Sequence, residues 1–281
     1  MAAWHAALPY RGRFTAARPA ALSALPLPPG PMPARRGTRP LKAWRYVLFV
    51  HPALIACVAR TRVGPLRDAF WAAWDRERCV WRRGAGPAAG RVQLAPGGAH
   101  VRAPGARIEL AFAETAGIEC VSPSGSAYGW TRKQAPLPAR ARVRLGRRER
   151  DLAGHVLVDD TAAYYERHTR WLWSAGIGRT REGRLAAWNL VSGVNDSARE
   201  SERTVWLDGT AFEPPPARFA ADLSAVGELR FQTEAELARR LSLGLVRSDY
   251  RQPMGAFSGR LPGGEELAEG LGVMERHDAW W

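Results

Sequence analysis

A tryptophan-rich stretch near the middle of the chain combines apolar and polar side chains that could line a binding cavity. It alternates like a β-strand, which would place Thr169, Trp171 and Trp173 on one face and His168 and Arg170 on the other. Two indole rings on one face can stack against a flat or polyene-like apolar ligand. The alternative is that both rings fill the interior of a barrel, because buried aromatic side chains usually serve packing.

A second polar and aromatic cluster occupies the end of the sequence. In an extended strand, Glu275 and His277 point to the same face because they are two residues apart. A carboxylate beside an imidazole could act as an acid–base pair, since the carboxylate raises the pKa of the histidine and orients its ring. The alternative is a buried structural pair that satisfies its own hydrogen bonds. His168 and Asp160 are the further candidates for a catalytic role.

Lysine is rare in this chain, and one of the lysines lies in the polar and aromatic segment Trp130–Gln134. The sequence has 41 lysine and arginine residues, of which all but Lys42 and Lys133 are arginine. A compact ammonium differs from a planar guanidinium in geometry and in the response of its pKa. Lys133 is therefore a candidate site residue, with a chance lysine at an exposed turn as the alternative.

The candidate ligand-binding residues comprise two tryptophans that would form an aromatic wall and several polar residues that would orient the ligand, as ligand pockets require. They are Trp171, Trp173, Arg170, Asn189, Asn195, Glu202 and Lys133.

No pattern in the sequence indicates a metal or a cofactor. The 6 histidines are far apart, and no phosphate-binding glycine loop or nucleophile elbow occurs. Cys57, Cys79 and Cys120 form no C-x-x-C pair, which argues against a disulfide framework and suits a reducing cytoplasm. We therefore predict a cytoplasmic protein without metal or cofactor.

The charge of the chain is strongly basic, with a formal net charge of +14. Arginine is spread along the sequence and not concentrated in one patch, so nucleic acid is not the expected partner. The longest apolar run, Trp44 to Ala59, is interrupted by Arg45, His51 and Pro52 and is too short to span a bilayer. We predict neither a transmembrane segment nor a secretory signal, and the sequence does not predict an oligomeric state.

Short alternating segments separated by glycine and proline predict an all-β fold. We expect a flexible or extended N-terminal segment over residues 1–38, rich in proline and arginine, then two barrel-like halves over residues 39–152 and 153–281. Residues 66–81 fit either a helix or a strand, and residues 234–240 have helical propensity. The later barrel is expected to be hollow and lined by the indoles.

An ordered series of segments resembles the bacterial domain-of-unknown-function family DUF2804, over roughly residues 25 to 281. The segments are Lys133-Gln134, Leu137–Ala139, Thr169–Trp173, Asn189, Ser201-Glu202, Val205–Gly209, Leu243–Val246, Phe257–Gly259 and Glu275–Ala279. The family is more distantly similar to the double lipocalin-like barrels of the carotenoid hydratase and AttH-like group. The resemblance implies two consecutive lipocalin-like antiparallel β-barrels and a hydrophobic or isoprenoid-like ligand.

Three functional hypotheses follow from these residues. The first is binding of an apolar or amphipathic small molecule, lipid or isoprenoid-like. The second is a cofactor-free hydratase or isomerase, in which Glu275 or Asp160 protonates a double bond, His168 or His277 moves the proton, and the tryptophans stabilise the developing cation. The third is a structural barrel that binds nothing, which would have a filled interior.

Overall fold

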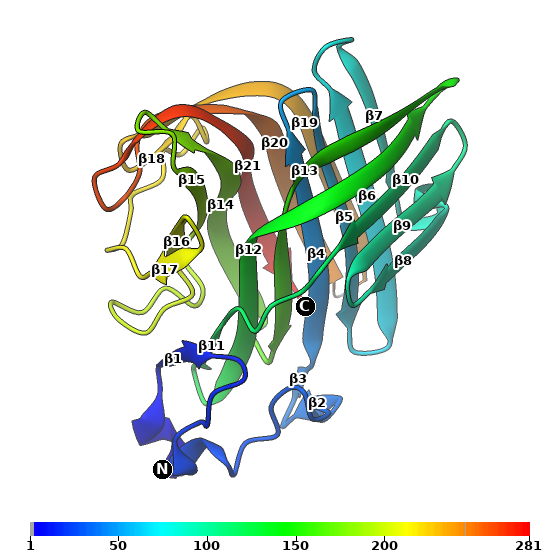
Figure 1. Cartoon of the computed structure of the whole chain (residues 1–281). Helices are drawn as coiled ribbons and strands as arrows, with labels where there is room; N and C mark the ends of the chain where they lie inside the picture. Colours follow the sequence, from blue (N-terminus) through cyan, green and yellow to red (C-terminus); the bar gives the residue numbers. More distant parts are fainter. Residues whose placement is uncertain (1–2, 245) are drawn as a thin grey trace.

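The computed structural model describes residues 3–244 and 246–281, and antiparallel β-strands form most of it (Figure 1). The prediction of an all-β fold is confirmed. The helical segments are short 3₁₀ turns at Ala3–Ala7, Ala20–Leu22 and Gly86–Ala89. None of the helical segments in this described part has the length and apolar character needed to cross a membrane.

The first sheet has the spatial order β7-β6-β5-β4-β13-β12-β10-β9-β8, and β11 joins β12 to β1. The long hairpin β12–β13 lies at its centre, and the pairing of the two strands has a register shift between Gln134 and Leu137. A separate two-stranded ribbon pairs β2 (Arg35–Arg36) with β3 (Arg39–Pro40). The strands of the first sheet are β1 (Tyr10–Arg13), β4 (Lys42–His51), β5 (Leu54–Val63), β6 (Leu66–Asp75), β7 (Val80–Ala85), β8 (Arg91–Ala95), β9 (Gly98–Ala103), β10 (Ala106–Phe112), β11 (Ile118–Ser124), β12 (Ala127–Leu145) and β13 (Arg148–Ala163).

The second sheet has the order β17-β16-β15-β14-β21-β20-β19-β18. Its centre is the pair β14–β21, where Gly176 lies opposite Gly272 and Gly178 opposite Gly270. The absence of side chains there leaves room for the indole of Trp188, since a Cβ on Gly176 would lie 2.2 Å from Cζ2 of that ring. The strands are β14 (His168–Thr180), β15 (Leu185–Ser192), β16 (Thr204–Leu207), β17 (Thr210–Phe212), β18 (Ala225–Val226), β19 (Leu229–Leu243), β20 (Val246–Arg260) and β21 (Glu266–Trp280).

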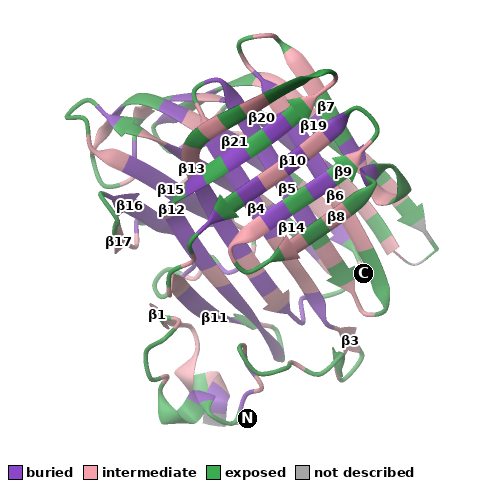
Figure 2. Cartoon of the chain, turned by 45° about the vertical axis from the view of Figure 1, so that its right-hand side comes forward, coloured by how far each residue is buried: buried purple, intermediate pink, exposed green. Residues whose placement is uncertain are grey.

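Each sheet has its own core, and a third apolar layer lies where the sheets face each other. Neighbouring residues of a strand point to opposite faces, so β4 sends Val47 and Phe49 into the core of the first sheet and Tyr46 towards the second sheet. On β15, Trp188 packs in the core of the second sheet, whereas Val191 belongs to the shared layer. The central strands are consequently buried on both faces, as the continuous purple bands in Figure 2 show.

The expected tail over residues 1–38 is packed against the first sheet in its described part, residues 3–38. Trp4, Leu22, Leu25 and Leu27 are buried in a small core with Tyr128 of β12 and its neighbours. In addition, β1 pairs with β11. The segment therefore covers one end of the first sheet. Its sequence has little helix or strand pattern, so this packing could not be predicted from it.

The change from the first sheet to the second falls later than the expected boundary at residue 152. The strand β13 pairs with both β12 and β4 as far as Ala163, and the second sheet begins with β14 at His168. The glycine and arginine turn near residue 147 is only the tip of a hairpin. A boundary at residue 152 thus divides a strand pair that belongs to one sheet.

Two segments of ambiguous pattern are strands. Residues 66–81 contain β6 and the start of β7, and residues 234–240 belong to β19. Both faces of the second half of β6 are buried, which removes the alternation that identifies a half-buried strand. Of the family-like segment Leu243–Val246, residue 245 lies outside the described residues, as do residues 1–2 of the N-terminal segment.

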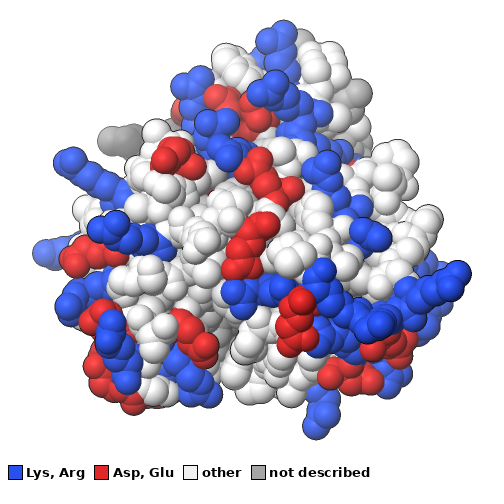
Figure 3. Space-filling model, turned by 90° about the horizontal axis from the view of Figure 1, so that it is seen from above, with Lys and Arg blue, Asp and Glu red and all other residues white. Residues whose placement is uncertain are grey.

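Basic and acidic side chains are interspersed on the surface seen in Figure 3. The arginine run of β12 follows the strand alternation, with Arg140, Arg142 and Arg144 exposed between buried Ala141 and Val143. Arg142 is within 3.0 Å of Asp151 on the neighbouring strand. The expectation that nucleic acid is not a partner stays a prediction.

Candidate functional site

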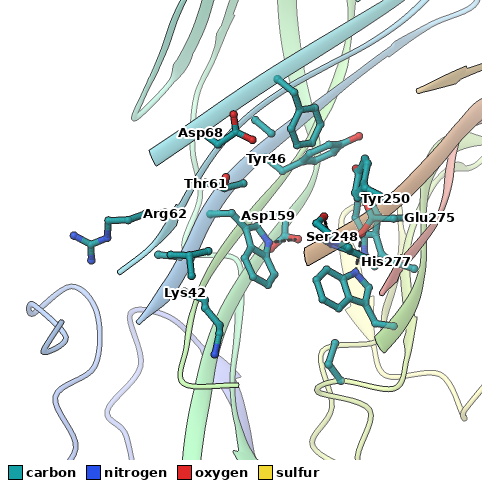
Figure 4. Close-up of a pocket in the computed structure, with 18 of the residues that line it drawn as sticks. Lys42, Tyr46, Thr61, Arg62, Asp68, Asp159, Ser248, Tyr250, Glu275 and His277 are labelled. Atoms are coloured by element: carbon teal, nitrogen blue, oxygen red, sulfur yellow. Dashed lines mark hydrogen bonds between the residues drawn. The ribbon is translucent and has the colours of Figure 1, made fainter. Parts of the chain in front are cut away.

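A cavity opens in the layer between the two sheets, with an empty volume of about 1310 Å³ that includes space open to solvent. Strands β4, β5 and β6 supply one wall, and β14, β19, β20 and β21 supply the other (Figure 4). Lining residues beside the β5–β6 and β19–β20 turns, such as Leu66 and Leu241, are exposed or half-buried, so the mouth lies there. Both Trp171 and Trp173 line this cavity, so they lie between the sheets and not, as was expected, inside a hollow second barrel.

Aromatic rings from both sheets form the walls of this cavity. The indoles of Trp44 and Trp171 are nearly parallel, at 10°, with centroids 5.9 Å apart. Tyr46 meets Trp173 edge to face at 5.4 Å. These pairs arise because β4 and β14 each turn every second side chain towards the other sheet. The result is a surface suited to a flat or unsaturated apolar molecule.

The buried carboxyl group of Glu275 faces the cavity among neutral hydrogen-bond donors. Its Oε1 accepts a hydrogen bond from Nε1 of Trp171 at 2.7 Å. Its Oε2 accepts bonds from the hydroxyl of Tyr250 at 2.8 Å and from the amide of Gln252 at 3.1 Å. Burial raises the pKa of Glu275 to about 7 despite these donors. Near neutral pH the group can thus both donate and accept a proton.

His277 shares the face of Glu275, as strand alternation requires, but it does not carry a charge. Its Nε2 is hydrogen bonded to Oγ of Ser248 at 2.7 Å, and its ring lies 4.3 Å from that of Trp171. Burial lowers the pKa of His277 to about 3, with Asp278 opposing that shift. The expectation that a carboxylate raises the pKa of this histidine is wrong, because desolvation exceeds the effect of the neighbouring charge.

Lys133 is fully buried, so the alternative of an exposed turn is wrong. Its Nζ lies 2.6 Å from Oδ1 of Asp159 and 3.4 Å from Oε1 of Glu202. Burial lowers the pKa of Lys133, but the two carboxylates outweigh that effect and hold it above its ordinary value. Burial also raises the pKa of Glu202, which relieves the excess of negative charge in this cluster. All three residues line the cavity.

Asn195 and Asn189 hold lining residues in place through hydrogen bonds. Nδ2 of Asn195 donates to the hydroxyl of Tyr165 at 2.7 Å and to Oε2 of Glu202 at 3.0 Å. Asn189 accepts a bond from Nε1 of Trp173 at 2.8 Å and donates to the backbone carbonyl of Glu202 at 2.9 Å. Asn195 is among the lining residues, whereas Asn189 fixes the orientation of Trp173 from outside the cavity.

Besides Asn189, three of the predicted site residues lie outside the cavity. Asp160 points to the opposite face of β13, where it pairs with Arg45 at 2.7 Å. His168 and Arg170 both contact the carboxylate of Asp278 on the outer face of β14, at 2.8 Å and 2.5 Å. The residue that takes the expected place of Asp160 is its neighbour Asp159, since adjacent residues of a strand face opposite sides.

Several lining residues are not among the predicted site residues, namely Lys42, Trp44, Tyr46, Ser248 and Tyr250. Trp44 and Tyr46 could have been predicted from the sequence, because they occupy alternate positions of a strand as Trp171 and Trp173 do. In residues 3–244 and 246–281, no group of three or more His, Cys, Asp or Glu side chains is arranged to hold a metal ion.

Comparison with known families decides where this chain belongs. The model of the family described as "Domain of unknown function (DUF2804)" matches residues 91–281. The chain belongs to family DUF2804. No curated protein matches the sequence of this DUF2804 protein.

Three solved structures align with this DUF2804 protein at low sequence identity. Kievitone hydratase from Nectria haematococca aligns with a TM-score of 0.50 and 10% identity, covering 84% of this chain and 88% of that one. A putative AttH from Nitrosomonas europaea aligns with a TM-score of 0.41 and 13% identity over 90% and 98% of the two chains. CghA gives a TM-score of 0.36 and 10% identity over 97% of each chain. The hydratase comparison confirms the predicted lipocalin-like fold.

Proposed function

We propose that this DUF2804 protein binds an apolar or amphipathic small molecule, lipid or isoprenoid-like, in the cavity between its two sheets. The observation that carries the proposal is an aromatic cavity with an open mouth, in which the buried side chains of Glu275 and Lys133 are held by fixed partners. Such an arrangement is typical of small-molecule sites. A structural barrel without ligand would have a filled interior, so the cavity favours binding. Free Cys57, Cys79 and Cys120 are compatible with the cytoplasmic location that we also propose.

The apolar fluorophore N-phenylnaphthylamine provides a direct test of this proposal. We expect its emission to rise on addition to the protein, and Trp171→Ala to weaken its binding about tenfold, or ~1.4 kcal/mol, through loss of ring stacking. Trp280→Ala is the matched control, because Trp280 is 42% exposed and lies outside the cavity. Equal effects of the two substitutions, or no binding by the wild-type protein, would contradict the proposal.

The buried carboxyl of Glu275 favours a second candidate function, acid catalysis on an isoprenoid double bond. Protonated Glu275 donates its proton to an alkene carbon, whose π electrons form the new C–H bond and leave a carbocation on the adjacent carbon. The faces of Trp44 and Trp171 stabilise that cation. Loss of a proton to the Glu275 carboxylate gives an isomer. Alternatively, water adds and its proton passes to the neutral imidazole of His277, which gives a hydrate.

Solvent isotope exchange tests the second function. With the isoprenoid alcohol farnesol in D₂O, we expect the wild-type protein to place deuterium on alkene carbons, as detected by mass spectrometry. Glu275→Gln should abolish this exchange, whereas Asp160→Asn should leave it unchanged because Asp160 faces away from the cavity. Exchange that survives Glu275→Gln would exclude Glu275 as the acid.

A further inference from the structure

Both lysines of this arginine-rich chain line the cavity. They differ in whether a carboxylate neutralises the ammonium, and this difference bears on the charge of the ligand. Lys133 is neutralised by Asp159 and Glu202, whereas none of the ion pairs found among residues 3–244 and 246–281 includes Lys42. Lys42 is nevertheless only 1% exposed. A buried ammonium without a carboxylate partner is costly, because desolvation is not offset by an opposite charge.

The surroundings of Lys42 hold its side chain in place and leave its charge uncompensated. Nζ donates one hydrogen bond, of 2.6 Å, to the backbone carbonyl of Tyr165, and an ammonium has three donors. The ring of Trp281 lies 5.5 Å away. Burial, with a smaller contribution from the positive charge of Arg39, lowers the pKa of Lys42 to about 8. The group is therefore mostly charged at neutral pH.

The other charged side chains of the lining are already satisfied. At the mouth, Arg239 pairs with Asp68. Glu275 is held by three neutral donors and is partly protonated near pH 7. Arg62, the remaining lining cation, is exposed to solvent. Lys42 is thus the buried charge of the described lining that an incoming ligand could neutralise.

We propose that Lys42 binds the anionic group of the ligand, which is an amphipathic organic anion such as a carboxylate attached to an apolar body. This inference rests on the proposed binding function and specifies its ligand. Lys42, Trp44 and Tyr46 share one face of β4, at intervals of about 7 Å along the strand. An anion at Lys42 would therefore extend its apolar body over Trp44, towards Trp171 and the carboxyl of Glu275.

Two fluorophores with one skeleton separate the charge from the apolar body. N-phenylnaphthylamine is neutral, and anilinonaphthalene sulfonate adds an anionic group to the same rings. We expect Lys42→Gln to weaken binding of the sulfonate about tenfold or more and to change binding of the neutral probe less than twofold. Arg230→Gln removes one positive charge at an exposed position of β19 outside the cavity, and it should leave both affinities unchanged.

The outcomes distinguish this inference from the proposed function. If the neutral probe binds and Lys42→Gln leaves the affinity for the sulfonate unchanged, the inference is wrong and the binding function stands. If neither probe binds the wild-type protein, the binding function is contradicted and the inference falls with it. Unchanged binding of the neutral probe to Lys42→Gln also shows that the variant is folded, so loss of sulfonate binding reports the charge alone.

Discussion

Replacing Lys133 with methionine is expected to lower the free energy of unfolding by about 3–5 kcal/mol, the cost of breaking a buried ion pair. The substitution keeps the apolar stem but leaves Asp159 and Glu202 in the cavity wall without their cation. The residues Asp159 and Glu202 are 6% and 3% exposed, so solvent offsets little of the lost interaction with the ammonium. Chemical denaturation monitored by tryptophan fluorescence measures the change.

The same strand supplies a matched control. Arg142 lies nine residues further along β12 and pairs with Asp151 on the outer face, where both side chains are mostly exposed. Exposed ion pairs contribute little, so Arg142→Met should leave the unfolding midpoint nearly unchanged. Adding Asp159→Asn to Lys133→Met should recover part of the loss, because it removes one of the unpaired charges. A Lys133→Met protein as stable as Arg142→Met would contradict the ion-pair account of the buried cluster.

The second large effect is the contribution of Glu275 to the pH dependence of the free energy of unfolding. Its pKa rises from an ordinary value of 4.5 to about 7 on folding, so the folded state binds a proton that the unfolded state releases between these values. The stability that this proton contributes is fully present below pH 4.5 and is lost as the pH rises through 7. Relative to Glu275→Gln, the wild-type protein should therefore lose on the order of 3 kcal/mol across this interval and change little above it.

Urea denaturation of both proteins at several pH values between 4.5 and 8.5 measures this difference, since other titrating groups contribute equally to the two curves. The pKa of His277 falls from an ordinary 6.5 to about 3 on folding, so this residue also makes stability depend on pH below 6.5, but it is present in both proteins and cancels in their difference. If wild-type and Glu275→Gln stabilities run parallel over the whole range, Glu275 is ionised throughout, and the acid role proposed for it fails.

Strand alternation predicted which side chains share a face but not which space that face borders. Trp171, Trp173, Glu275 and His277 follow the alternation, and so do His168 and Arg170 on the outer face. In a single barrel, one face of a strand borders the interior and the other borders solvent. Here two sheets are packed together, so the face opposite each core is buried as well. The position of the cavity depends on that packing, which the sequence does not encode locally.

The pairing of Lys133 with Asp159 was equally inaccessible to sequence analysis. It depends on the register of β12 against β13, which places these residues directly opposite each other and shifts at a bulge two residues further on. Asp159 and Asp160 are adjacent, and a shift of one residue exchanges their faces. Without the register, the choice of Asp160 over Asp159 had no physical basis. The family and the all-β fold needed no such detail, since they follow from an ordered series of segments and from repeated short strands.

The most direct test of the central claim is a crystal structure of the protein with N-phenylnaphthylamine. The account predicts electron density for the probe between the two sheets, in contact with Trp44 and Trp171 and within reach of Glu275. Density inside the core of either sheet or only on the outer surface, with the space between Trp44 and Tyr250 empty, would contradict it.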